Sequence, residues 1–153
     1  SLLISCSGPA TLAPDGTEIP KEINTIIIKT GLTIDSAYKA TGRVLSSEDY
    51  FIKSNDKDFG QITTDWKTLP SKGLGQAPAD SKIKTNIIED DNSIRVIIKG
   101  DTRPGRGLYE YDVDDIQHFG QKGSQMRLAW QEMYRVAKEL NKALDGSMAF
   151  ETR

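Results

Sequence analysis

The strongest structural signal in this chain is a run of apolar residues at helical spacing in its last part. They recur every three or four positions, so they form one stripe along a helix predicted over residues 124–145. Gly146 follows and is a typical helix stop. A helix of about five turns with one apolar stripe needs another element to cover that stripe. The stripe consists of Met126, Ala129, Trp130, Met133, Ala137, Leu140 and Leu144.

Alternating apolar and polar residues predict the strands that could cover this helix. Ile94, Val96 and Ile98 alternate with charged residues, which is typical of a half-buried strand. With the turn at residues 90–92, the segments 82–89 and 93–100 are expected to form a hairpin. Within a strand predicted over residues 60–68, Ile62, Thr64 and Trp66 should share one face. Further strands are predicted at residues 24–30, 50–54 and 108–113.

A second helix is predicted after the first strand. Thr33 can cap it, and apolar residues from Ile34 to Leu45 follow at helical spacing. The resulting order is β-α-β-β-β-β-(β)-α, which predicts an α+β fold. We expect an antiparallel sheet of about five to six strands, with both helices packed on one face in a helix-grip-like arrangement. Residues 23–146 should form a single domain, and residues 147–153 a C-terminal tail.

The N-terminal segment resembles a bacterial lipobox. Leu3-Ile4-Ser5 precedes Cys6, which is the one cysteine of the chain. We interpret residues 1–5 as a signal-peptide remnant and Cys6 as the lipidation site. Residues 6–22 are rich in Gly and Pro, so they are expected to form a tether with a reach of about 20 Å. These features predict a lipoprotein of the bacterial cell envelope, located at the outer membrane and facing the periplasm.

The overall composition is that of a globular protein. Hydrophobic residues make up 37% of the chain, charged residues make up 27%, and the net charge is −2. This charge argues against nucleic acid as a partner, because nucleic-acid binding needs a basic surface. No run reaches the roughly 18 apolar residues that a membrane-spanning helix requires. The oligomeric state is not determined by these features.

Part of the pattern is similar to the BamC (NlpB) lipoproteins of the outer-membrane assembly machinery. The similarity is carried by Ala37-Tyr38 and Val44-Leu45, by Tyr50-Phe51-Ile52, and by the segment from Gly60-Gln61-Ile62-Thr63 to Trp66. It covers residues 23–145 as an order of elements and residues 37–66 as motifs. The resemblance implies a helix-grip module in the envelope, with a membrane anchor and an envelope protein as partner.

Several residues are candidates for a binding site. Trp66 and Trp130 are expected to pack helix against sheet, or to line a cleft for a small apolar ligand. Arg103 and Arg106 lie among glycines. Two readings are open: the arginines bind a phosphate or a carboxylate, or the segment is an ordinary connecting loop. Tyr109 and Tyr111 would share one face of the strand predicted over residues 108–113. The basic side of the last helix could face anionic lipid or an acidic partner, or be an ordinary solvated face; it comprises Arg127, Arg135, Lys138 and Lys142.

Catalytic and metal chemistry are poorly supported by the sequence. His118 is the only histidine, and no Gly-x-Ser-x-Gly motif accompanies it. The carboxylates between Glu110 and Asp115 lack the EF-hand order, so a solvated edge is favoured over a calcium site. We therefore expect no cofactor, no metal and no catalytic residue. The sequence predicts a non-enzymatic docking module for another envelope component or, alternatively, a periplasmic carrier of a small apolar or amphipathic ligand.

Overall fold

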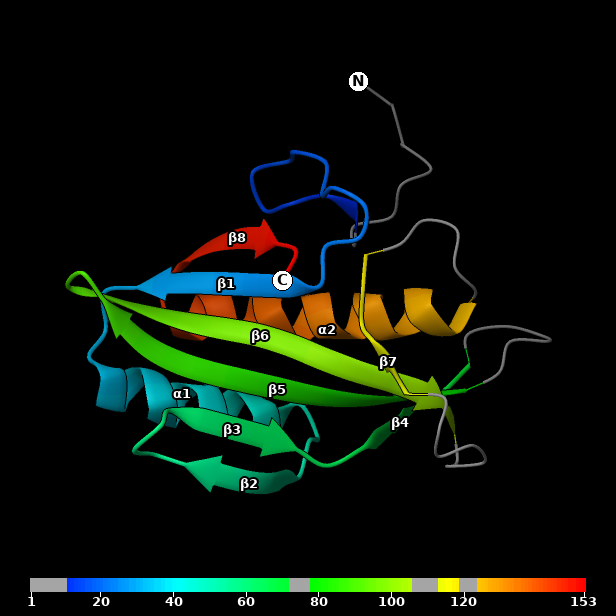
Figure 1. Ribbon diagram of the computed structural model, residues 1–153, viewed down its shortest axis with the longest axis horizontal. Coiled ribbons are helices and arrows are strands. Elements are labelled where there is room, and N and C mark those ends of the chain that lie inside the picture. The colour runs from blue at the N-terminus through cyan, green and yellow to red at the C-terminus, as the bar shows by residue number, and fades with distance from the viewer. Residues whose placement is uncertain (1–10, 72–77, 106–112, 119–123) are drawn as a thin grey trace.

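The computed structural model confirms the α+β fold (Figure 1). It describes residues 11–71, 78–105, 113–118 and 124–153. These residues form two helices and one antiparallel sheet of eight strands, slightly more strands than the sequence predicts. In chain order the elements are β1 (Thr25–Thr30), α1 (Ile34–Ser47), β2 (Ile52–Asp56), β3 (Gln61–Thr64), β4 (Lys67–Leu69), β5 (Ala79–Asp90), β6 (Ser93–Pro104), β7 (Asp114–Asp115), α2 (Ser124–Ala143) and β8 (Ser147–Glu151).

The sheet is built around the hairpin of β5 and β6. The two strands pair without a break from Ala79↔Pro104 to Asp90↔Ser93. Asp91 and Asn92 connect them with φ angles of 45° and 65°, the left-handed pair that a tight two-residue hairpin turn requires. The strand order is β2-β3-β5-β6-β1-β8, with β4 added to β5 and β7 added to β6. The hairpin therefore lies at the middle of the sheet, and β2 and β8 form its edges.

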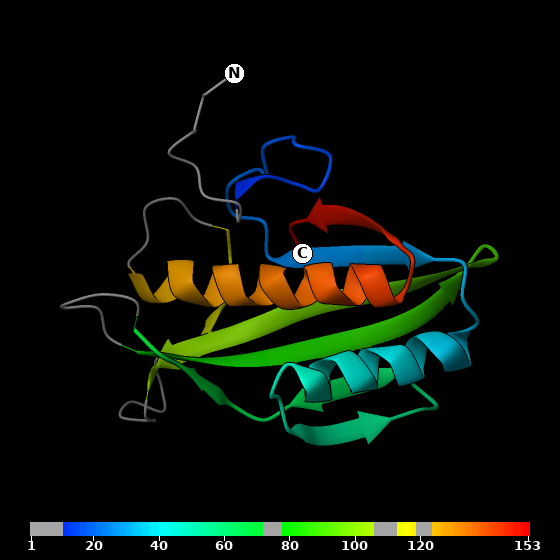
Figure 2. The same ribbon diagram turned by 180° about the vertical axis from the view of Figure 1, so that it is seen from behind.

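Both helices cover the same face of this sheet (Figures 1 and 2). The covered face carries the isoleucines and valines that alternate along the central strands, including Ile26, Ile83 and Ile98, all fully buried. From α2, Trp130, Met133 and Leu140 pack into the same core. From α1, Ala37, Thr41 and Leu45 are buried. The opposite face of the sheet is not covered by a helix in either view.

The ends of the helices are fixed by local hydrogen bonds. The side chain of Thr33 accepts a hydrogen bond from the backbone of Ser36 and caps α1 as predicted. At the end of α2, Asp145 adopts the left-handed conformation, with φ 45°. Gly146 has a different role from the one predicted, because a Cβ there would lie 2.5 Å from Ile28 Cγ2. This glycine lets the chain pass close to β1 before β8 begins.

The predicted domain boundaries are wrong at both ends. Residues 147–153 were expected to form a tail, but β8 pairs with β1 from Thr25↔Glu151 to Lys29↔Ser147. Residues 6–22 were expected to form a tether, but the described part of this segment packs on the domain. Ile19 is only 2% exposed, and the hydroxyl of Tyr134 donates to the Leu12 carbonyl. Apolar contacts and backbone pairing at both ends explain the larger domain.

The predicted strands near residues 50–68 also need correction. Tyr50 is buried before β2 begins, and the expected strand over residues 60–68 is divided into β3 and β4. At the break, the backbone N–H of Trp66 donates a hydrogen bond to Oδ1 of Asp65. The break places Trp66 on the uncovered face of the sheet, whereas Ile62 faces α1. The strand expected over residues 108–113 falls, except for its last residue, outside the described residues. Among the described residues, no helix is long and apolar enough to cross a membrane.

Gly60 is predicted to be essential for the sheet, whereas Gly31 is not. Gly60 has φ 67°, and a Cβ there would lie 2.1 Å from the Ile87 carbonyl oxygen. Gly60→Ala should therefore lower the free energy of unfolding by more than about 2 kcal/mol in chemical denaturation. Gly31→Ala is the matched control, because a Cβ at Gly31 meets no atom within 4 Å. Equal stabilities of the two variants would contradict this account of the β2–β3 connection.

Candidate functional site

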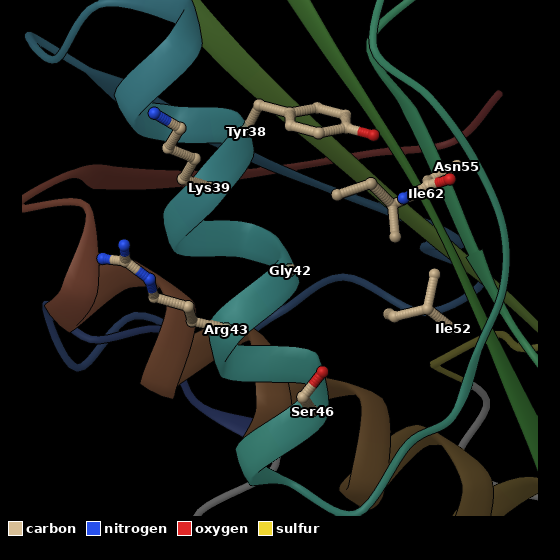
Figure 3. Close-up of a pocket in the computed structure, with 8 residues that line it drawn as sticks. All are labelled: Tyr38, Lys39, Gly42, Arg43, Ser46, Ile52, Asn55 and Ile62. Carbon is tan, nitrogen blue, oxygen red and sulfur yellow. The ribbon is translucent and has the colours of Figure 1, made fainter.

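The described surface is hollowed between α1 and the β2–β3 hairpin. This groove has a volume of about 470 Å³. Figure 3 shows Tyr38 and Gly42 of α1 facing Ile52 of β2 and Ile62 of β3 across it. Gly42 keeps it open because the glycine has no side chain and its ideal Cβ position lies 3.9 Å from Ile62 Cδ1. The remaining lining residues are Lys39, Arg43, Ser46 and Asn55.

Three large apolar side chains on or next to the elements that line this groove are exposed. Phe51 is 82% exposed and Phe59 is 72% exposed, at the two ends of the β2–β3 hairpin. Ile34, at the start of α1, is 41% exposed although the sequence predicts it in the buried stripe. Two aromatic rings in water represent a considerable unfavourable hydration free energy. Large exposed apolar side chains beside an open groove are typical of interaction surfaces.

The groove is also open at the sheet edge and basic on its helix side. β2 ends the strand order, so its outer backbone groups pair with no strand among those described. Lys39 and Arg43 line the groove, and no carboxylate does. Figure 3 shows both basic side chains extending from the outer side of α1. Asp35 pairs with Lys39, whereas Arg43 has no acidic partner in the described part of the chain.

A second cluster lies on the uncovered sheet face and contains two of the predicted site residues. The guanidinium of Arg103 stacks over Trp66, with 4.2 Å between its carbon and the ring centroid. Arg103 Nε also donates to Asp80 Oδ2 at 2.9 Å, and Thr68 donates to the other oxygen of the same carboxylate. The structure therefore brings together two of the predicted site residues, Trp66 and Arg103, which the sequence did not place near each other. Both oxygens of the Asp80 carboxylate are thus hydrogen bonded within this cluster.

Trp130 lies elsewhere, in the core beneath α2. It is 2% exposed and stacks on Tyr134, with ring centroids 6.0 Å apart. His118 packs on the other side of Trp130 with a 5.1 Å centroid distance. Trp130 and Trp66 are therefore on opposite sides of the sheet and cannot line one cleft. None of the hollows described here is lined by either tryptophan.

His118 is a structural residue in this arrangement. It is 8% exposed, and its Nδ1 lies 2.9 Å from the Pro20 carbonyl oxygen. Its backbone pairs with Ile23, so it joins the N-terminal segment to the domain. No group of three or more His, Cys, Asp or Glu side chains that could hold a metal occurs among the described residues. Cys6, Arg106, Tyr109 and Tyr111 lie outside the described residues, and so does Glu110.

A network of partly buried ionic groups connects the end of α1, β4 and α2. Glu132 of α2 accepts hydrogen bonds from the Tyr50 hydroxyl and from Lys67 Nζ, both at 3.0 Å. Arg135 pairs with Glu132 and also with Glu48 at the end of α1. Burial opposes the charged form of Glu132, but the hydrogen bond and charge of Lys67, helped by Arg135, outweigh it and lower the Glu132 pKa. Burial, together with the Glu132 charge, raises the Tyr50 pKa.

The sequence contained signals for the groove that our predictions did not use. Phe51 and Phe59 flank a polar segment where large apolar residues have no core to enter. Gly42 lies one helical turn from both Tyr38 and Ser46, which places a gap on one side of α1. The pattern shows that these residues are unusual, but it does not show which strand faces the gap.

Comparisons with known proteins do not assign a family. No family model matches the chain, and no curated protein matches it significantly. Among solved structures, the chain is similar to a DUF4468 family protein from Bacteroides ovatus, at 12% sequence identity and a TM-score of 0.38. The match covers 92% of this chain and 91% of the other.

The Glu132 network predicts a specific dependence of stability on pH. Because the pKa of Glu132 is lowered by folding, its stabilisation is complete above its ordinary pKa of 4.5 and is lost as the pH falls through the folded value. Glu132→Gln should therefore be less stable than wild type at pH 7 and lose less stability on acidification to pH 3. Denaturation curves at several pH values measure this difference.

Glu139→Gln is the matched control for this experiment. Glu139 lies on the same helix, but its pair with Lys142 is exposed, with side chains 42% and 76% accessible. It should behave as wild type at every pH. A Glu132→Gln variant with the wild-type acid dependence would show that the network does not couple protonation to folding.

Proposed function

We propose that this protein is a non-enzymatic docking module anchored in the bacterial envelope, and that the groove between α1 and β2–β3 is its docking site. The observation that carries the proposal is the open groove, where Tyr38 faces Ile52 and Ile62, together with exposed Ile34, Phe51 and Phe59 on or next to the elements that line it. The expected partner is an envelope protein that presents an exposed segment with apolar side chains flanked by carboxylates. The apolar side chains fit between Tyr38 and Ile62, and the carboxylates fit Lys39 and Arg43.

The lipid anchor would determine how this groove is presented. With Cys6 lipidated, residues 7–10 separate the anchor from Thr11, the first described residue, so the two are at most about 18 Å apart. This distance is shorter than the tether inferred from sequence. The N-terminal segment packs near β8, through Tyr134 and its ring contact with Phe150, whereas β2 is the opposite edge of the sheet (Figure 1). The anchor would therefore hold the β8 edge close to the outer membrane and present the groove away from it.

Docking is better supported than the alternative of ligand carriage. A carrier would need a cavity between sheet and last helix, whereas this region is filled by Trp130, Met133 and Tyr134, each at most 2% exposed. Catalysis has less support still, because His118 is hydrogen bonded to backbone and borders no described hollow. The fold itself is compatible with the proposed likeness to BamC-type helix-grip modules.

Filling the groove should abolish docking without unfolding the protein. We expect Gly42→Leu to occupy the space between Tyr38 and Ile62 and to remove glycine from a helix, which stabilises α1 by up to about 1 kcal/mol. A benzophenone side chain placed at position 59 should crosslink to a partner in cells of the source organism. The Gly42→Leu variant should lose this product. In the product formed with glycine at position 42, mass spectrometry should identify a partner segment that contains apolar residues flanked by carboxylates.

Gly42→Ala is the control at the same position, because its single methyl group leaves the groove open. It should keep the crosslink and show a similar gain in helix stability. A crosslinker at Val113, which is 43% exposed, controls for unspecific capture. If the position-59 product persists in Gly42→Leu, or equals the product at Val113, the groove is not the docking site.

The anchor has a separate test. The full-length precursor, expressed in a bacterium, should incorporate labelled palmitate and fractionate with membranes. Cys6→Ser should lose the label and become soluble, because it has no other cysteine to receive the lipid. Labelling that is equal in both proteins would exclude Cys6 as the anchor, and it would leave the docking groove unaffected.

A further inference from the structure

The uncovered face of the sheet carries a second hollow that is independent of the docking groove. It has a volume of about 440 Å³, which is in the range of small-molecule sites. In Figure 1 this face is turned toward the viewer, with the helices behind it. Three strands and one later residue contribute the lining: Gln61, Thr63, Lys84, Thr85, Asn86, Ile97, Lys99 and Arg153.

The sheet register arranges these side chains in two adjacent rows. Asn86 lies between Gln61 of β3 and Ile97 of β6. In the next row, Lys84 lies between Thr63 and Lys99. Residues within a row have Cβ atoms about 5 Å apart, and the rows are about 7 Å apart. One row is therefore basic and the other is rich in amides.

The basic row juxtaposes two like charges. Lys84 and Lys99 are directly opposite each other, an arrangement that destabilises a sheet unless an anion compensates it. Lys84 is compensated by Asp101, with Nζ 3.0 Å from Oδ1. Lys99 has no acidic side-chain partner in the part of the chain that the structure describes, and no Asp or Glu side chain lines the hollow. Lys99 therefore contributes a positive charge that no described acidic side chain compensates.

Arg153 is held beside this row by a buried amide. Asn24, 6% exposed, donates from Nδ2 to the Arg153 carbonyl and accepts from its backbone N–H. These two bonds, 2.8 and 2.9 Å long, fix the backbone of Arg153 across the start of β1. The Arg153 Nε pairs with Glu151, which leaves the other guanidinium nitrogens as donors. Arg153 is thus a positioned third cation.

The amide row supplies neutral polar groups and one apolar surface. The Oδ1 atom of Asn86 is buried and has no hydrogen-bond partner in the structure. A buried amide oxygen without a partner is unfavourable, and a ligand hydroxyl that reaches it would satisfy it. Gln61 and Thr63 offer further donors and acceptors. Ile97, 7% exposed, forms an apolar patch that suits the carbon skeleton of a small polyol.

We propose that this hollow binds a phosphorylated polyol or sugar. The phosphate lies over Lys99, between Lys84 and Arg153, and the hydroxyl groups face Asn86 and Gln61. Phosphate fits because its oxygens accept hydrogen bonds from several cationic and amide donors at once. The same chemistry occurs in free phosphorylated polyols and in glycerophospholipid headgroups. The assignment does not depend on the docking groove, which lies on the other side of β3.

The experiment uses glycerol 3-phosphate and glycerol as soluble probes, followed by backbone NMR of the full chain. Glycerol 3-phosphate should shift the amide signals of Lys84, Asn86 and Lys99, whereas glycerol should not. Lys99→Gln should weaken binding by about tenfold or more, since it removes the uncompensated cation. Lys53→Gln is the control, because Lys53 is an exposed strand lysine outside the hollow. Gly42→Leu should bind the probe as wild type does.

Vesicles distinguish the two sources of the ligand. Binding to phosphatidylglycerol vesicles that is lost in Lys99→Gln, without binding to phosphatidylcholine vesicles, assigns the site to a lipid headgroup. Binding of soluble glycerol 3-phosphate without vesicle binding assigns it to a free phosphorylated polyol. The proposal is overturned if neither glycerol 3-phosphate nor phosphatidylglycerol vesicles bind at millimolar concentration, or if Lys99→Gln and Lys53→Gln weaken binding equally.

Discussion

The continuous pairing of β5 with β6 is the constraint on which the rest of the structure depends. Twelve residues on each side form one hairpin, closed by the left-handed turn at Asp91-Asn92. Because side chains alternate along a strand, this register sends Ile83 and Ile98 to one face and Lys84 and Lys99 to the other. A slip by one residue would exchange the two sets. The covered core, the uncovered basic row and both proposed sites therefore depend on a single alignment.

The two proposed sites use the two faces of the same strand. Ile62 of β3 borders the groove toward α1, whereas Gln61 and Thr63 border the basic hollow. The sites can thus act separately, since a change of side chain on one face leaves the other face in place. The ionic network around Glu132 stabilises the groove side by tying α1 to β4 and α2. The described part of the N-terminal segment, residues 11–22, is held by Tyr134 and His118 at the opposite edge and lines neither site.

Much of the fold could be predicted because its signals are local. The stripe from Met126 to Leu144, the alternation at Ile94–Ile98 and the cap at Thr33 each act within a few residues, and all three predictions are confirmed. The failures involve contacts between distant parts of the chain. Residues 147–151 have a weak strand pattern and become β8 because β1 offers a free edge. Ile19 lies in a Gly- and Pro-rich segment and is buried because α2 and its aromatic residues are nearby.

For the candidate site residues too, local features could be predicted from the sequence, whereas contacts between distant residues could not. Trp66 and Trp130 were sound candidates by residue type, but the break between β3 and β4 places them on opposite sides of the sheet. The sequence by itself determined the two helices, the central hairpin and the lipobox-like Cys6, because periodicity and short motifs are local properties. Only the tertiary structure decided that Gly42 faces Ile62 and that Lys84 faces Lys99. Those juxtapositions depend on strand register and helix packing, which join residues that are distant along the chain.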